Sequence, residues 1–400
     1  MSFHLLTKAR NRTVFSYLLS RAFSHGPQRP GRPSFGIAFD IDGVILLGNS
    51  PVGGSPGALR KLYGADGGLK IPYVFLTNGG GFPEAKRAFE LSQLLGVNVS
   101  PSQVLQGHSP FKQLVKRFEN DLVVAVGKGE PAAVMSEYGF RHALSIDEYA
   151  SCFENIDPLA PYKKWTSNLA TMQNSKFNES FPRNDVLSKR VQAAFIVSDP
   201  VDWSRDIQVL CDILKTGGLP GRNVGPQPHI YFANDDLEYQ TKFPSERLGM
   251  GAFRIALESI FNRIHPHCLE YTCFGKPHPS VFKNAEIVLQ KLVASLYDDF
   301  YDKNHDKTSS FKTLYMIGDN PAVDIRGARQ TGHPWFSILT RTGVFKGKEN
   351  HDKFSADLVI PCLEKSHKYV NLFPLALLSF LVVDTVEEAV DYILAKECAS

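Results

Sequence analysis

The sequence lacks three features that would each assign it to a special class of protein. Its six cysteines are scattered and do not form the pattern of a small disulfide-linked domain. No apolar run reaches the roughly eighteen residues that a membrane-spanning helix needs. Acidic residues are absent from the first 39 positions, and the rest of the chain carries 38 basic against 41 acidic residues. We therefore expect neither a membrane span nor a nucleic-acid partner.

The first 30 residues have the composition of a targeting leader. They are rich in arginine and serine, contain no acid, and offer leucine, valine and phenylalanine for one face of a helix. These features favour import into mitochondria and predict a location in the matrix. A chloroplast transit peptide is one alternative, and a disordered basic tail on a cytoplasmic protein is another.

After residue 34, short apolar runs alternate with helical patterns. A helix is predicted over 83–96, with a proline near its start and a glycine at its end. The predicted strands are 35–40, 71–78, 121–127, 193–199, 229–234, 313–319 and 335–340. This alternation predicts an α/β fold with a doubly wound parallel sheet covered by helices on both faces. Ligands of such sheets bind beyond the carboxyl ends of the strands.

Polar residues cluster where several of these apolar runs end. Carboxylates that meet at one edge of a sheet repel each other and raise each other's pKa. A hard divalent cation relieves this repulsion, and Mg²⁺ prefers a few carboxylates together with water and a substrate phosphate. The sequence therefore predicts a Mg²⁺ site built from Asp40, Asp42, Asp319 and Asp324.

The same segments supply the groups needed to transfer a phosphoryl group. Asp40 is the predicted nucleophile, and Asp42 is the predicted general acid and base, whose backbone carbonyl also reaches the metal. Asp319 is the predicted metal ligand, braced by Asp324 from behind. The phosphate oxygens are expected to bind Thr77, Asn78 and Lys276.

Four segments in this order resemble the four motifs of the haloacid dehalogenase superfamily. They are DIDGV (40–44), LTN (76–78), GKP (275–277) and GDNPAVDI (318–325). The long interval between the second and third motifs leaves room for a second domain, at the position of a class II cap. The stretch FANDDLEY (232–239) is similar to a TNPD-like box of class IIA members, with Asn234 and Asp236 at the matching positions. The resemblance implies that these two residues contribute to substrate specificity.

The resemblance also carries expectations about activity and assembly. It implies a Mg²⁺-dependent phosphatase of a small phosphorylated metabolite, acting through an aspartyl-phosphate, and a possible homodimer through the cap. Together with the leader, the chain resembles the mitochondrial, cat-eye-syndrome-critical-region-protein-like subgroup. The alternative is a catalytically weak protein of the same fold that binds a metabolite or a protein partner. The presence of both Asp40 and Asp42 argues against that alternative.

The predicted domain organisation follows from these motifs. Residues 34–118 and 268–400 are expected to form the core, and residues 119–267 the cap. Residues 360–382 are a possible insertion within the core, because their removal leaves an uninterrupted strand, helix cap and helix. A genuine extra loop is the equal alternative.

Two further patterns suggest ligands only weakly. The stretch 121–132 ends in a glycine pattern similar to a dinucleotide-binding fingerprint, but it falls inside the predicted cap. The stretch 265–273 contains histidines and cysteines without a second matched pair at zinc-finger spacing. A strand with its turn, and a loop between the domains, are the favoured interpretations.

Overall fold

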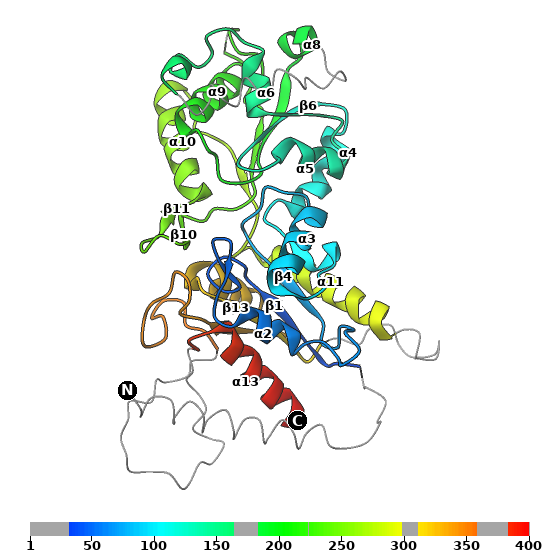
Figure 1. Cartoon of the computed structure of the whole chain (residues 1–400). Helices are drawn as coiled ribbons and strands as arrows, with labels where there is room; N and C mark the ends of the chain where they lie inside the picture. Colours follow the sequence, from blue (N-terminus) through cyan, green and yellow to red (C-terminus); the bar gives the residue numbers. More distant parts are fainter. Residues whose placement is uncertain (1–31, 164–182, 223, 298–310, 358–382, 400) are drawn as a thin grey trace.

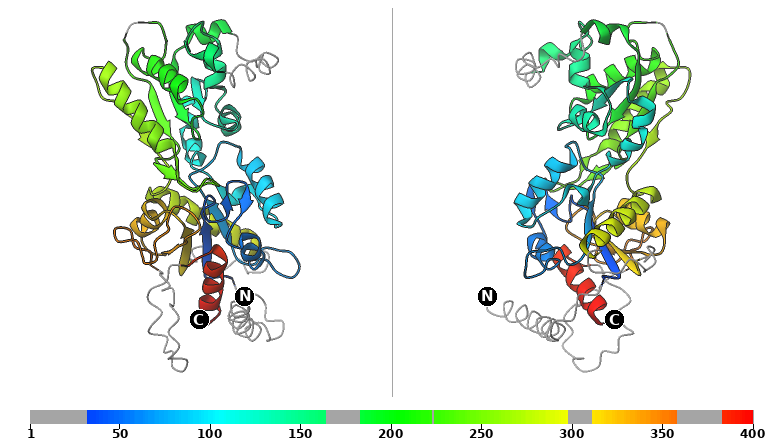
Figure 2. Two further views of the ribbon diagram at one scale, coloured as in Figure 1. Left: turned by 60° about the vertical axis from the view of Figure 1, so that its left-hand side comes forward. Right: turned by 90° about the vertical axis from the view of Figure 1, so that its right-hand side faces the viewer.

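The computed structural model describes residues 32–163, 183–222, 224–297, 311–357 and 383–399. The predicted leader (1–30) and the predicted insertion (360–382) lie outside the described residues. The described strands include two five-stranded sheets. Figure 1 shows them in two tiers, with one sheet and its helices above the other, and Figure 2 shows the same arrangement from two other sides.

The lower sheet, called the core sheet, has the strand order β14-β13-β1-β4-β5, and its neighbouring strands are parallel. Its strands are β1 (Phe35–Phe39), β4 (Tyr73–Leu76), β5 (Val104–Leu105), β13 (Thr313–Gly318) and β14 (Trp335–Leu339). Beyond β14, Thr340 makes a parallel bridge to Val383. Strand β1 is central, and the chain runs from it first to β4 on one side and later to β13 on the other. The carboxyl end of β1 is therefore the topological switch point of the sheet.

Helices cover both faces of the core sheet because successive residues of a strand point to opposite sides. Ile37 and Phe39 pack in one cluster, and Ala38 between them packs in another. The first face carries α2 (Ser55–Arg60), α3 (Glu84–Leu95) and α13 (Val386–Ala399). The second face carries α11 (Pro279–Tyr297) and α12 (Arg326–Thr331). Helix α3 confirms the helix predicted over 83–96, and it ends at Gly96 with φ 65°.

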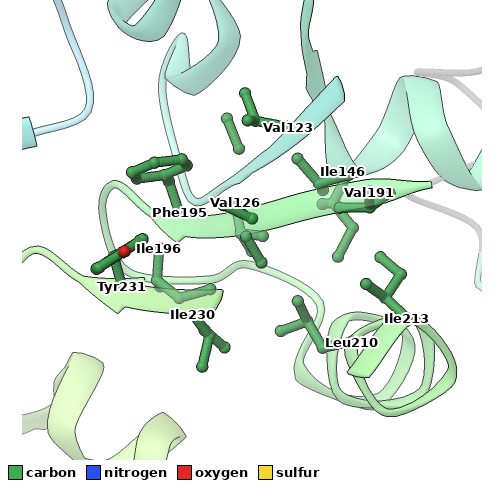
Figure 3. Close-up of a cluster of buried hydrophobic side chains, with 14 of the residues drawn as sticks. Val123, Val126, Ile146, Val191, Phe195, Ile196, Leu210, Ile213, Ile230 and Tyr231 are labelled. Carbon is green, nitrogen blue, oxygen red and sulfur yellow. The ribbon is translucent and has the colours of Figure 1, made fainter. Parts of the chain in front are cut away.

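The upper sheet, called the cap sheet, has the order β12-β9-β8-β6-β7 and is also parallel. Its strands are β6 (Leu122–Val126), β7 (His142–Ser145), β8 (Val191–Ile196), β9 (His229–Phe232) and β12 (Thr272–Cys273). The helices of this part are α4 (Val115–Phe118), α5 (Pro131–Tyr138), α6 (Ile146–Ser151), α8 (Arg183–Ser188), α9 (Trp203–Lys215) and α10 (Met250–Ile264). Figure 3 shows Leu210 and Ile213 of α9 on one side of β8, with Phe195 on the other.

Two short hairpins reach toward each other between the tiers. The core contributes β2 (Leu46–Leu47) with β3 (Ser50–Pro51), and the cap contributes β10 (Glu238–Tyr239) with β11 (Arg247–Leu248). A Cβ atom placed on Gly48 at the tip of the core hairpin would lie 3.1–3.5 Å from carbons of the Lys242 side chain. The two hairpins are therefore in contact.

The structure confirms the predicted α/β fold, a doubly wound core with an inserted α/β cap. Within the described residues, none of the helices is long and apolar enough to cross a membrane. The exact domain boundaries stay a prediction. Strand β12 pairs with β9 of the cap sheet although it lies beyond the predicted end of the cap.

Candidate active site

Three of the predicted site segments begin where core strands end. Asp40 follows β1 directly, and its backbone N–H donates to the Ile317 carbonyl of β13 at 2.9 Å. Thr77 follows β4 directly, and its N–H donates to the Leu105 carbonyl of β5 at 3.0 Å. Asp319 follows β13 directly. The hydrogen bonds of the sheet thus continue into the site and place these side chains at one edge.

A buried lysine joins two of the predicted carboxylates. The Lys276 Nζ atom lies 2.9 Å from Asp40 Oδ1 and 2.6 Å from Asp324 Oδ1. The lysine is 2% exposed and Asp324 is fully buried. Burial disfavours the charged lysine, but the two carboxylates outweigh that effect and raise the pKa of Lys276. The ammonium form of Lys276 is therefore favoured in the site.

Asp319 is held in place by the backbone. Its Oδ2 atom accepts a hydrogen bond from the Val344 N–H at 2.6 Å. A Cβ atom on Gly43 or Gly343 would lie 2.5 or 1.8 Å from Asp319 Oδ2, so both positions need glycine. Burial and the repulsion from Asp40 and Asp324 raise the pKa of Asp319 well above its ordinary value.

The carboxylates of Asp40, Asp319 and Asp324 suit a metal ion. Each offers one oxygen, and these oxygens lie within 4.8 Å of one another. For the same reasons of burial and repulsion, the pKa of Asp324 rises to about 6 and that of Asp40 also rises. A hard divalent cation fits this set, because it prefers oxygen ligands and offsets the repulsion. The predicted metal contact of Asp42 is through its backbone and stays a prediction.

Asp42 lies on the side of the site that faces the cap. A Cβ atom on Gly79 would lie 2.7 Å from Asp42 Oδ2, so the glycine lets this carboxyl approach the loop after β4. Burial raises the pKa of Asp42, while the positive charges of Arg87 and Lys128 work in the opposite direction. A raised pKa favours the protonated form, which a general acid needs.

Asn78 connects the core to the cap. Its Nδ2 atom donates to Asp236 Oδ1 and to the Lys276 carbonyl, both at 2.9 Å, and its Oδ1 atom accepts from the Lys276 N–H at 2.7 Å. Asn234 Nδ2 in turn donates to the Asn78 carbonyl at 2.9 Å. Asn78 thus fixes the backbone of Lys276, and the two cap residues fix Asn78. Thr77 Oγ1 accepts from the Gly79 N–H at 3.0 Å and shapes the same loop.

An ion pair to helix α10 holds the turn that carries Asn234 and Asp236. The Asp235 carboxylate between them pairs with the Arg254 guanidinium of α10, with Nε at 2.6 Å from Oδ1. Burial raises the pKa of Asp236 to about 7, although its hydrogen bond from Asn78 opposes that rise.

The structure brings all nine predicted site residues to the lining of one pocket between core and cap. Five other cap residues with polar side chains line the same pocket and were not predicted: Lys128, Asp199, Glu238, Tyr239 and Gln240. Lys128 and Asp199 follow β6 and β8, so the rule that ligands bind at strand ends could have found both. The sequence carries no comparable signal for the other three.

The two weaker ligand patterns have other roles in the structure. The glycine loop after β6 contacts the core, because the Glu130 N–H donates to the Gly81 carbonyl at 2.6 Å. In the region 265–273, His265 Nδ1 interacts with the backbone of His267. Across the described residues, the three-carboxylate group is the only cluster of potential metal ligands found.

Two family models match segments that contain the core strands, and the first of these segments extends into the cap. The haloacid dehalogenase-like hydrolase model matches residues 37–141, and the HAD-hydrolase-like model matches residues 273–366. The first segment contains Asp40, and the second contains Lys276, Asp319 and Asp324. The fold and these matches together define the class of protein as a capped α/β hydrolase.

Two relatives match most of the chain. A mitochondrial hydrolase of Saccharomyces cerevisiae is 33% identical over 342 residues, which cover 81% of this chain and 92% of the relative. The chain belongs to the haloacid dehalogenase superfamily of hydrolases. A cardiolipin synthase (CMP-forming)/mitochondrial hydrolase fusion protein of Schizosaccharomyces pombe is 32% identical over 368 residues. That match covers 89% of this chain but only 55% of the fusion protein.

Solved structures share the fold at lower identity. A hypothetical protein of Pyrococcus horikoshii has a TM-score of 0.51 at 18% identity, covering 90% of this chain and 99% of the other. A possible sugar phosphatase of the HAD superfamily from Cytophaga hutchinsonii has a TM-score of 0.50 at 16% identity. That match covers 78% of this chain and 86% of the other. These two likenesses support the capped architecture.

Proposed function

We propose that this hydrolase is a Mg²⁺-dependent phosphatase of a small phosphorylated metabolite and acts through an aspartyl-phosphate on Asp40. The observation that carries the proposal is the position of Lys276 Nζ, within hydrogen-bond distance of both Asp40 and Asp324 in a buried site. The contact orients the Asp40 carboxylate, and the ammonium group offers positive charge to phosphate oxygens.

In the first step, a carboxylate oxygen of Asp40 attacks the phosphorus atom. The new O–P bond forms as the bond from phosphorus to the leaving oxygen breaks. Asp42 donates its proton to the leaving oxygen, so the product departs as a neutral alcohol. Lys276, Thr77 and the backbone around Asn78 stabilise the negative charge on the remaining phosphate oxygens.

In the second step, water attacks the phosphorus atom of the aspartyl-phosphate. Asp42, now a carboxylate, accepts a proton from this water, and the bond between Asp40 and phosphorus breaks. Inorganic phosphate leaves, and both aspartates return to their starting states.

The charge of the pocket supports a requirement for a cation. Seven acidic side chains line the pocket against two lysines, so a phosphate dianion would be repelled without further positive charge. Asp40 and Asp319 would hold Mg²⁺, with Asp324 bracing them. The ion would supply charge that neutralises the phosphate oxygens.

We also propose that the protein acts in mitochondria, in the matrix. The acid-free, arginine-containing leader supports this location, as does the name of the yeast relative, which is a mitochondrial hydrolase. Pairing of two copies through the cap stays a prediction.

The proposal is tested by phosphate release from the full-length protein. Phosphate esters such as p-nitrophenyl phosphate and a panel of phosphorylated metabolites are assayed with and without Mg²⁺. We expect turnover that requires Mg²⁺ and that falls by on the order of 10⁴-fold or more in Asp40→Asn, because the nucleophile is lost. Asp352→Asn, the same change at an exposed position of the core, should retain wild-type turnover. Undiminished turnover by Asp40→Asn would refute the mechanism.

A further inference from the structure

Gln240 is a buried polar residue of the pocket that the proposed chemistry does not use. It follows β10 in the cap hairpin, is only 5% exposed, and lines the pocket together with Asp40 and Lys276. Its position on the cap places it on the side of the pocket opposite the core strands. Because the proposed chemistry holds the phosphate at the ends of the core strands, a residue on the opposite side would face the leaving group of a substrate.

The orientation of the Gln240 amide follows from its hydrogen bonds. Its Nε2 atom donates to the Thr241 carbonyl at 2.8 Å and to the Phe243 carbonyl at 2.9 Å. Carbonyl oxygens only accept hydrogen bonds, so the nitrogen of the amide must face them and the oxygen must face away. Among the residues that the structure describes, the buried Oε1 atom has no hydrogen-bond partner. Buried acceptors of this kind are normally satisfied, which points to a donor supplied by a ligand.

The neighbouring cap residues restrict the chemistry of that donor. Asp199 and Glu238 line the pocket and add further acceptor oxygens. Lys128 is the one basic cap residue in the lining, and its Nζ atom already lies 2.8 Å from Asp199 Oδ2. A leaving group with a carboxylate or a second phosphate would meet uncompensated negative charge here, whereas hydroxyl groups would find acceptors.

We propose that Gln240 is a specificity-determining residue whose Oε1 atom accepts a hydrogen bond from a hydroxyl group of the leaving alcohol. The substrate class is then the phosphate monoesters of neutral, hydroxyl-rich alcohols, such as polyols and sugars. This assignment rests on the proposed phosphatase function and names the substrate class of the same site.

The test compares esters that differ only in their leaving groups, using the full-length protein with Mg²⁺. Glycerol 3-phosphate is paired with propyl phosphate, which has the same three carbons without the hydroxyl groups. We expect kcat/KM for glycerol 3-phosphate to be at least about tenfold higher, because a site built to bind a hydroxyl group rejects an analogue that lacks it. A wild-type ratio near one would overturn the assignment.

A variant of Gln240 tests whether its Oε1 atom causes the preference for glycerol 3-phosphate over propyl phosphate. Gln240→Met preserves the length of the side chain but removes the acceptor, and it should bring the ratio of the two esters down to about two or less. Gln208→Met, the same change at an exposed position on α9 of the cap, should keep the wild-type ratio. A full wild-type ratio in Gln240→Met would overturn the role of this residue. If that variant does not fold, as judged by circular dichroism, the comparison of esters with the wild-type protein still decides the substrate class.

Two more esters test the charge argument. 3-Phosphoglycerate adds a carboxylate, and its kcat/KM should be at least about tenfold below that of glycerol 3-phosphate. Phosphoethanolamine offers an ammonium donor, and a tenfold preference for it would overturn the assignment to hydroxyl groups. Phosphate release from every ester without discrimination would refute this inference alone. Release from no ester would refute the proposed function and this inference with it.

Discussion

The core and the cap each place a lysine–aspartate pair at the pocket, and the two pairs differ in burial rather than in distance. Lys276 lies 2.9 Å from Asp40, and its side chain is 1% exposed. Lys128 lies 2.8 Å from Asp199, and its side chain is 47% exposed. Removing one partner of a buried pair leaves an uncompensated charge and costs about 3–5 kcal/mol, whereas an exposed pair contributes about 0–1 kcal/mol.

This difference separates two tasks of one pocket. The core groups are buried and held by the backbone, so their geometry is set before a substrate arrives. The cap groups include exposed side chains, which can adjust to a leaving group. We infer that the core determines the reaction and that the cap determines which ester reacts.

The largest expected effect compares the two lysines. Lys276→Met should lower kcat for p-nitrophenyl phosphate by about 10³-fold, because it removes the buried charge that stabilises the phosphate oxygens. Lys128→Met should lower kcat by less than about tenfold, because the Lys128 side chain is exposed and already paired with Asp199. Steady-state kinetics on variants shown to be folded by circular dichroism would measure both. Equal losses would contradict the division of tasks.

The next effect concerns the stability of the cap. Phe195 is fully buried in β8, and its ring centroid lies 5.1 Å from those of Phe111, Phe140 and Tyr231. Phe195→Ala should lower the free energy of unfolding by about 3–5 kcal/mol, because it leaves a cavity. Phe89 on α3 of the core is 66% exposed, so Phe89→Ala should change the free energy of unfolding by less than about 0.5 kcal/mol. The measurement is urea unfolding followed by circular dichroism. A similar loss of unfolding free energy in Phe195→Ala and Phe89→Ala would contradict this prediction.

A smaller effect lies at the joint between core and cap. His108 is fully buried, and its Nδ1 atom lies 2.7 Å from the hydroxyl group of Tyr138 on α5. The same hydroxyl group donates a hydrogen bond to Glu84 of α3 at 2.6 Å. Burial lowers the pKa of His108 to about 4. The unfolded chain, with an ordinary pKa near 6.5, takes up this proton more readily, so stability is lost as the pH falls from about 6.5 to about 4.

In the wild-type protein, His108 should lower the free energy of unfolding by about 2 kcal/mol as the pH falls from about 7 to about 5. His108→Gln should remove that part of the pH dependence, and His333→Gln, at an exposed position, should preserve it. The measurement is urea unfolding at the two pH values. An unchanged difference in His108→Gln would show that this histidine does not stay neutral in the folded protein.

The smallest effect concerns the contact between cap and core at Asn78. Asn234→Ala removes the hydrogen bond to the Asn78 carbonyl and should lower kcat by about tenfold, because Asn78 holds the backbone of Lys276. Asn284→Ala, at an exposed position on α11, is the matched control and should leave kcat within about twofold. If only KM rose in Asn234→Ala, the residue would act on substrate binding and not on the geometry of the core.

The amino-acid sequence alone determined the type of fold and the edge at which the site lies. Apolar runs that end in Asp40, Thr77 or Asp319 reveal strands and their carboxyl ends, because the period of a strand and its polar termination are local properties of the chain. The doubly wound sheet and the residues at its strand ends were predictable for this reason, whereas the cap was implied by the resemblance to the haloacid dehalogenase superfamily. The short strand β12, which leads toward Lys276, was not, since two residues carry no periodicity.

Only the tertiary structure decided which of these groups meet. Lys276 reaches Asp40 across 236 positions, and Asn78 reaches Asp236 across 158. These contacts depend on how two separate sheets and their loops come together, which no local pattern encodes. The same holds for the Oε1 atom of Gln240, because whether a polar atom is buried without a partner is a property of the packed protein.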